Sequence, residues 1–105
     1  MIDFKFNFEK GEYEINPSGA PVEISELDAL KQWIEYKLRY SVDIVGLLAG
    51  HLPRDYVKLE LKRVVTDALT QHSEINSVSD VYVRDNVITV KVNTIYGNAE
   101  VTSDD

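Results

Sequence analysis

Carboxylate side chains are the commonest groups in this sequence that could catalyse a reaction. Glu9 and Glu12 lie close together in the chain, and so do Asp80 and Asp85. Hydrolysis of a glycosidic bond needs two carboxyl groups that face a sugar cleft. The chain has 18 acidic residues among 105, however, so such pairs also arise by chance. A small carboxylate-dependent hydrolase of cell-wall glycan is therefore kept only as an alternative, and no catalytic residue is predicted.

Other catalytic and ligand-binding patterns are weak. His51 and His72 are far apart and do not form the i, i+4 pair with a glutamate that zinc enzymes use. Gly46 and Gly50 resemble a phosphate-binding loop only in their glycines, because no Lys-Ser or Lys-Thr follows them. The better interpretation of the two glycines is tight packing or a helix end. We therefore expect no metal, no cofactor and no enzymatic activity.

Composition excludes further classes of function. The formal net charge of −7 repels phosphate backbones and argues against nucleic-acid binding. The absence of cysteine excludes disulfides and thiol catalysis. No apolar run is long enough to span a bilayer, and the N-terminus lacks the basic and apolar regions of a secretion signal. These features are typical of an ordinary globular domain, and the length fits one domain over residues 1–105, with residues 1–2 and 102–105 frayed.

The N-terminal third predicts a hairpin followed by a helix. Phe4, Phe6 and Phe8 alternate with polar residues, as in a half-buried strand, and a turn at Gly11 leads to a second strand. Residues 16–21 form a loop by composition. Ser25 precedes acidic residues that favour a helix start, so we expect a helix over about residues 26–40.

The predicted helix over residues 26–40 has an unusually wide apolar arc. Its core stripe and the strip beside it leave only a narrow polar arc. The core stripe is Leu27, Leu30, Ile34 and Leu38; the second strip is Ala29, Trp33, Tyr36 and Tyr40; the polar arc is Asp28, Lys31, Gln32, Glu35 and Arg39. Two interpretations of the aromatic residues remain open: burial against a sheet, or exposure as anchors of a protein interface.

The second half of the chain predicts another helix and a longer hairpin. Residues 41–52 are an apolar crossover or a short helical turn, and Pro53 suits the first turn of the next helix. On that helix Leu59 points away from the apolar face. Asp85 and Asn86 tolerate the positive φ of a tight turn, so residues 78–97 predict two strands joined there, with a bend or bulge at Asn93 and Thr94.

These elements predict a single α+β domain. We expect an N-terminal hairpin, two helices and a C-terminal hairpin, with a mixed or antiparallel sheet packed on the helices. A long regular edge strand of such a sheet invites another chain to pair with it.

Several segments, taken in order, resemble a known protein family. They are "FEKGEYEI", "LDALKQWI", "RYSVD", "PRDYVKLELKR", "INSVSDV" and "VNTIYGNAEV". The sequence resembles the baseplate proteins encoded in the tail operons of PBSX-type prophages of Gram-positive bacteria, which are related to the contractile-tail sheath-initiator proteins (lysozyme-like baseplate wedge proteins). The resemblance covers nearly the whole chain. Its most specific parts are Phe8 to Gly11, Leu30 to Trp33 and Asn93 to Gly97.

This resemblance implies a structural, non-enzymatic protein of a phage tail or tailocin baseplate, assembled in the bacterial host cytoplasm and located in the virion. The implied partners are baseplate wedge proteins and the tail sheath protein, whose extended arms would add to the sheet. Relatives have a longer segment after the first helix; here it is short and lacks their glutamate, and Arg39 is the position carried over. A regulatory adaptor of the same fold is a further alternative, and the isolated chain could form a homodimer.

The residues predicted to bind partners come from the aromatic strip, the exposed face of the second helix and the final strand, together with Arg39 from the family resemblance. They are Trp33, Tyr36, Arg39, Tyr40, Leu59, Asn93, Tyr96 and Gly97.

Overall fold

The computed structural model describes residues 2–50 and 53–103 and confirms the α+β class. The chain divides into two compact units, Met1–Trp33 and Ile34–Asp105. The helix α1 (Glu26–Tyr40) crosses from one unit into the other and has the bounds that the sequence predicts. His51 of the predicted connection lies outside the described residues.

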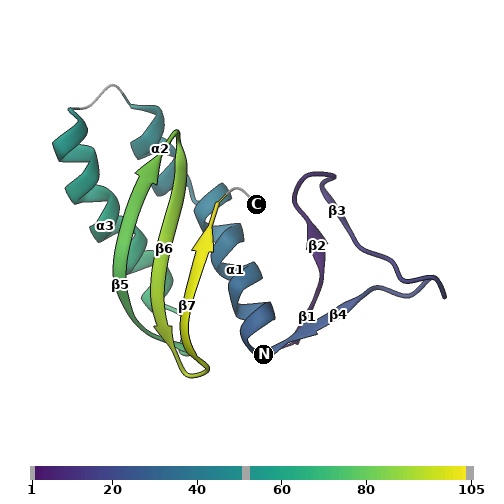
Figure 1. Cartoon of the computed structure of the whole chain (residues 1–105). Coiled ribbons are helices and arrows are strands. Elements are labelled where there is room, and N and C mark those ends of the chain that lie inside the picture. The colour runs from purple at the N-terminus through teal and green to yellow at the C-terminus, as the bar shows by residue number, and fades with distance from the viewer. Residues whose placement is uncertain (1, 51–52, 104–105) are drawn as a thin grey trace. The chain divides into compact units, whose positions relative to one another are not determined.

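The first unit contains two small antiparallel sheets rather than one hairpin (Figure 1). Their strands are β1 (Ile2–Phe4) with β4 (Glu23–Ser25), and β2 (Phe6–Asn7) with β3 (Glu12–Tyr13). The predicted hairpin is the second pair. It turns at Gly11, whose φ of +68° is the left-handed region that a side chain disfavours.

A ring of three backbone hydrogen bonds joins the two sheets of this unit. The Lys5 N–H donates to the Val22 carbonyl (2.7 Å), the Val22 N–H to the Glu14 carbonyl (3.0 Å), and the Glu14 N–H to the Lys5 carbonyl (2.9 Å). Lys5 therefore satisfies its backbone groups at the point where the chain leaves β1 and enters β2.

Gln32 of α1 fastens these strands to the helix. Its Oε1 accepts a hydrogen bond from the Phe6 N–H (2.8 Å), and its Nε2 donates to the Phe4 carbonyl (2.8 Å) and to Asp3 Oδ2 (3.2 Å). The amide thus bonds to alternate residues of one chain, as a neighbouring strand would. Gln32, predicted as part of the polar arc, is a structural residue of the first unit.

Gln32→Ala is expected to lower the free energy of unfolding by about 1–3 kcal/mol, because it leaves the Phe6 N–H and Phe4 carbonyl without this partner. Urea denaturation measures the loss, and hydrogen exchange should show faster exchange of the Phe6 amide. Gln71→Ala is the matched control, since Gln71 is exposed at the end of the next long helix. Equal effects of the two substitutions would contradict the role of Gln32.

The second unit contains the end of α1, two further helices and a three-stranded antiparallel sheet in the order β5-β6-β7 (Figure 1). The elements are α2 (Val42–Ala49), α3 (Arg54–Thr70), β5 (Ile75–Arg84), β6 (Val87–Thr94) and β7 (Gly97–Thr102). Helix α3 contacts β5 and α2. It begins after Pro53, as predicted, because proline needs no N–H at a helix start.

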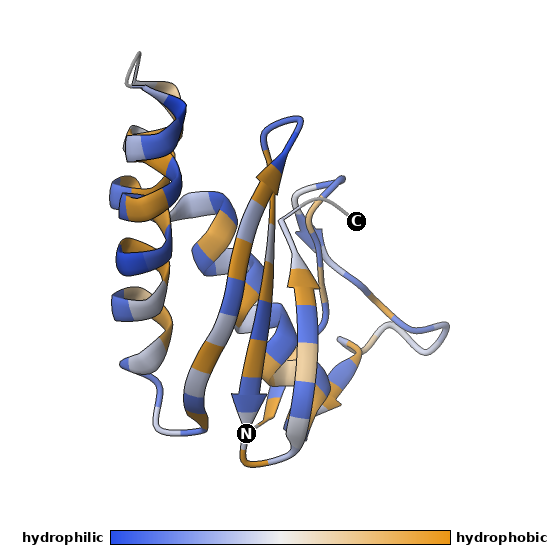
Figure 2. Ribbon diagram, turned by 60° about the vertical axis from the view of Figure 1, so that its left-hand side comes forward, coloured by the Kyte–Doolittle hydropathy of each residue, from blue (hydrophilic) through white to orange (hydrophobic). Residues whose placement is uncertain are grey.

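One face of this sheet is apolar and the other polar, which Figure 2 shows as alternating orange and blue bands along the strands. Val81, Val90 and Val101 are paired across the three strands and are all buried. The helices supply the other half of the core. Their buried side chains in this unit are Ile34, Leu38, Ile44, Leu61, Val65 and Leu69.

Three predicted features of this unit are altered in the structure. The connection after α1 is a regular helix, α2, rather than a crossover or single turn. The chain after Thr94 turns at Ile95 and Tyr96 and returns as a third strand, so the C-terminal element is a three-stranded meander. The predicted bend or bulge at Asn93 and Thr94 is displaced to the neighbouring strand: both residues pair regularly with β7, and the register shift opposite them, between Ile75 and Ser77, lies in β5.

The predicted turn between β5 and β6 is confirmed. Asp85 and Asn86 have φ values of +52° and +64°. A side chain at positive φ costs about 1–2 kcal/mol, and Asn and Gly tolerate it best. Asn86→Ala is therefore expected to destabilise the protein by about 1 kcal/mol, whereas Asn86→Gly should not. Thermal unfolding of the two variants measures the difference, and an Asn86→Gly variant as unstable as Asn86→Ala would contradict the explanation.

Candidate functional site

The two edges of the three-stranded sheet are not equivalent. The edge strand β5 has register shifts between Ile75 and Ser77 and between Val78 and Asp80. Such bulges disrupt the backbone geometry that an incoming strand requires. The opposite edge strand, β7, pairs with β6 without any shift. In residues 2–50 and 53–103 no strand pairs with its outer side. We call this outer side of Gly97–Thr102 the β7 edge.

The register of β7 identifies the backbone groups that point outward. The Ser103 N–H donates to the Ile88 carbonyl at 2.8 Å, so these residues form a hydrogen-bonded pair that continues the ladder. Bonded and non-bonded pairs alternate in an antiparallel ladder. Asn98 and Glu100 therefore occupy non-bonded positions, where the N–H and carbonyl point away from β6. They are the groups that an added strand would meet.

The polar face of the sheet carries an ordered row of charges. Asp80, Lys91 and Glu100 pair in register across β5, β6 and β7. A second row contains Ser77, Asn93 and Asn98, in which Asn93 Nδ2 donates to Ser77 Oγ at 2.8 Å. The row of charges alternates in sign and ends in a carboxylate at the β7 edge.

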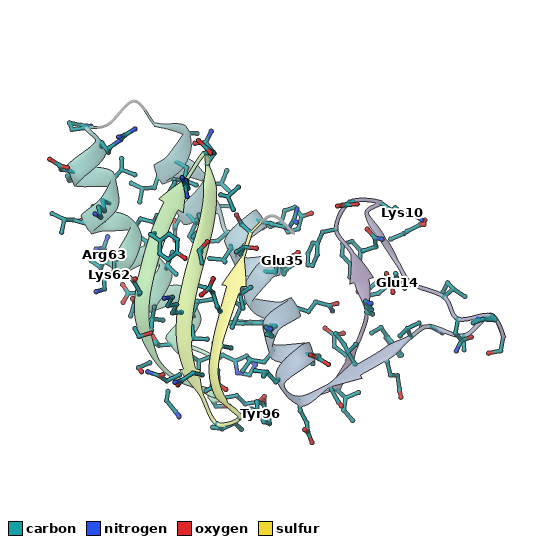
Figure 3. All side chains as sticks on the ribbon, in the orientation of Figure 1. Lys10, Glu14, Glu35, Lys62, Arg63 and Tyr96 are labelled. Atoms are coloured by element: carbon teal, nitrogen blue, oxygen red, sulfur yellow. The ribbon has the colours of Figure 1, made fainter. Side chains whose placement is uncertain are left out.

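Of the predicted residues in the final segment, Tyr96 lies in the turn before β7 and Gly97 is the first residue of β7. The Tyr96 hydroxyl donates to Glu74 Oε1 at 3.0 Å, and the Ile95 N–H donates to the Glu74 carbonyl at 3.0 Å. Figure 3 shows Tyr96 at the end of the sheet where β6 turns into β7. Gly97 has a φ of +110°, which suits glycine alone among common residues. These residues position the β7 edge, and Asn93 lies one strand inside it.

The aromatic side chains of the predicted strip on α1 differ in how far they are exposed. Trp33 is half-buried, whereas 53% of Tyr36 and 51% of Tyr40 are exposed. The two tyrosine rings are tilted against each other with centroids 5.2 Å apart. The structure thus brings Tyr36 and Tyr40 together on the surface of the second unit.

Helix α2, which follows this tyrosine pair in the chain, adds exposed apolar side chains that sequence reasoning missed. Val42 is 84% and Val45 45% exposed. Tyr40 and Val45 line one groove of about 580 Å³ between α2 and the β5–β6 turn. We call Tyr36, Tyr40, Val42 and Val45 the α2 surface. The signal was present: an eight-residue helix with Asp43 as its one charged residue cannot bury every side.

Arg39, carried over from the family resemblance, lies in an ion pair. Its Nε is 3.1 Å from Glu35 Oε2, and the two side chains are only 20% and 10% exposed. Glu35, predicted to lie on the polar arc, is buried because it faces this partner. The pair stabilises the fold locally, and its role toward a partner protein stays a prediction.

Leu59 lies apart from the other predicted residues. It is 76% exposed on α3, beside the exposed Tyr56. The same helix carries an exposed network in which Arg63 Nη2 is 2.8 Å from Glu60 Oε2 and Nη1 is 3.4 Å from Asp67 Oδ2. The hydrogen bonds that Arg63 donates to Glu60, followed by the charge of Glu60, raise the pKa of Arg63 above its usual value. Exposed networks of this kind contribute little to stability.

No candidate catalytic centre emerges from the described residues. Asp85 lies in the β5–β6 turn and Asp80 in the charged row, while Glu9 and Glu12 flank the turn of the first hairpin. Within the described part of the chain, no cluster of potential ligands suits a metal ion, and no helix is long and apolar enough to cross a membrane. The β7 edge and the α2 surface are therefore the candidate sites, and both suit protein partners. No family model matches the chain, and no curated protein compared with it is similar.

Proposed function

We propose that the protein is a non-catalytic structural component of a contractile phage tail or tailocin baseplate. It joins wedge proteins to the first sheath ring through protein contacts and through a strand that adds to its sheet. The observation that carries this proposal is the regular β7 edge, which offers the outward backbone groups of Asn98 and Glu100. An added strand satisfies such groups with backbone hydrogen bonds.

The α2 surface supports the wedge contact. Exposed tyrosines beside apolar side chains are typical of interface anchors, because aromatic residues bury a large area at low cost in side-chain entropy. Tyr36, Tyr40, Val42 and Val45 provide such a surface on the second unit. We assign the wedge proteins to this surface and the sheath arm to the β7 edge.

The test combines reconstitution with genetics. The purified chain, mixed with the neighbouring baseplate and sheath gene products, should co-elute with both in size-exclusion chromatography. Deletion of its gene should leave tails without sheath in electron micrographs. Absence of association, together with complete sheathed tails in the deletion strain, would refute the proposal. Clearing of a peptidoglycan suspension by the purified chain would favour the hydrolase instead.

A second measurement separates the two surfaces. Val42→Ser with Val45→Ser should weaken association with wedge proteins at least about tenfold, because it removes both valine side chains from the α2 surface. Stability should fall only slightly, since Val42 is 84% exposed and Val45 45% exposed. Leu59→Ser is the matched control on α3. Equal weakening by Leu59→Ser would contradict the assignment.

A further inference from the structure

We propose that the strand received by the β7 edge carries a lysine or arginine opposite Glu100, with an apolar residue on each side of that cation. This inference rests on the proposed function, because it specifies the partner of the same edge. It follows from the side chains that the register places in rows across β5, β6 and β7.

The charged row determines the central residue. Lys91 lies between Asp80 and Glu100, so the signs alternate across the sheet. Glu100 is exposed, and it makes no hydrogen bond or ion pair with any described residue. The next position of the row lies on the added strand. Opposite charges stabilise directly paired strand residues and like charges destabilise them, so that position favours a cation.

The apolar face determines the two flanking residues. Ala99 and Val101 precede and follow Glu100, and their side chains lie on the opposite face of the sheet. Val101 continues the buried row of Val81 and Val90, while Ala99 continues the row of Val78 and Val92. Each row extends onto the added strand as an apolar side chain.

The three-residue pattern does not depend on strand direction. An antiparallel and a parallel strand both place alternate side chains on the two faces, so a central cation between apolar neighbours fits either way. We favour the antiparallel direction because the sheet is antiparallel throughout. The net charge of the chain separately favours a cationic partner, because a charge of −7 attracts a basic segment over a longer range.

Short synthetic peptides test the inference on the full-length chain. Their residues alternate between threonine and an apolar residue, leucine or valine. The central residue, whose side chain would lie on the polar face of the sheet, is lysine, threonine or glutamate. Binding is followed by fluorescence anisotropy up to about 1 mM protein at low salt. The lysine peptide should bind about three- to tenfold more tightly than the glutamate peptide. Raising the salt concentration should shrink this difference.

Two variants of the chain test whether Glu100 causes the preference for the lysine peptide. Glu100→Lys should reverse the order, so that the glutamate peptide binds best. Glu9→Lys makes the same change of net charge on an exposed residue of the first unit and should leave the order unchanged. An order that is unaffected by Glu100→Lys, or reversed equally by Glu9→Lys, would overturn the inference.

A peptide with N-methylated backbone amides on its pairing side separates this inference from the proposed function. If all unmodified peptides bind equally and the methylated one does not, strand addition stands and the charge preference is wrong. If none of them binds, the inference falls, and co-elution with wedge and sheath proteins decides the baseplate function independently. If the methylated lysine peptide binds as well as its parent, the contact is not strand addition and the inference is overturned.

Discussion

Asn98→Pro should abolish the proposed capture of a sheath arm and leave the fold intact. The Asn98 N–H occupies a non-bonded position of the β6–β7 ladder and points out of the sheet. Proline removes that donor and places its ring where the added strand would approach. The preceding residue is Gly97, which has no Cβ to clash with the proline ring.

Ala99→Pro, one residue further on, should have the opposite outcome. Ala99 pairs with Val92 at a bonded position, so proline deletes a ladder hydrogen bond and leaves a buried carbonyl of β6 without its donor. The free energy of unfolding should fall by about 2–4 kcal/mol. For Asn98→Pro the fall should stay below about 1 kcal/mol.

Urea denaturation and co-elution with the sheath protein distinguish the two proline variants. We expect Asn98→Pro to be folded and unable to bind the sheath protein, while wedge association through the α2 surface persists. A folded Asn98→Pro variant that still recruits the sheath protein would show that the β7 edge is not the receiving strand. An unfolded Asn98→Pro variant would contradict the assigned register, because that register places no intramolecular hydrogen bond on its N–H.

The elements predicted correctly are those whose signals are local. Helix α1 follows from its apolar spacing and acidic first turn, and the turn at Asp85 and Asn86 follows from the tolerance of these residues for positive φ. Helix α2 was left undecided because its apolar residues have no polar face to define a helical period. The sequence prediction treated β6 and β7 as one strand. The turn between them consists of Ile95 and Tyr96, and neither is a residue typical of turns.

The candidate sites depend on long-range pairing, which a single sequence does not contain. The sequence predicted an open strand edge, but the choice of β7 over β5 depends on bulges that only the register shows. Tyr36 and Tyr40 were predicted from helical spacing and are exposed together. Gln32 and Glu35 were placed on a solvated arc, because spacing alone does not show that strands or Arg39 would cover them.

Arg39→Ala should destabilise the protein far more than the loss of an exposed arginine. It leaves the carboxylate of Glu35, whose side chain is 10% exposed, without its guanidinium partner at 3.1 Å. Removing one member of a buried pair costs more than the pair itself contributes, because the remaining charge stays desolvated. Since Arg39 is itself 20% exposed, we expect a loss of about 2–3 kcal/mol in the free energy of unfolding.

Two further variants separate a folding role of Arg39 from a partner-binding role. Arg63→Ala removes an arginine that is 61% exposed and should leave the urea midpoint unchanged. The double variant Glu35→Leu with Arg39→Leu should recover most of the stability lost in Arg39→Ala, because both charges of the pair are removed together. If this double variant also binds wedge proteins normally, Arg39 acts through the fold. Restored stability without restored binding would instead assign Arg39 to the interface, as the family resemblance implies.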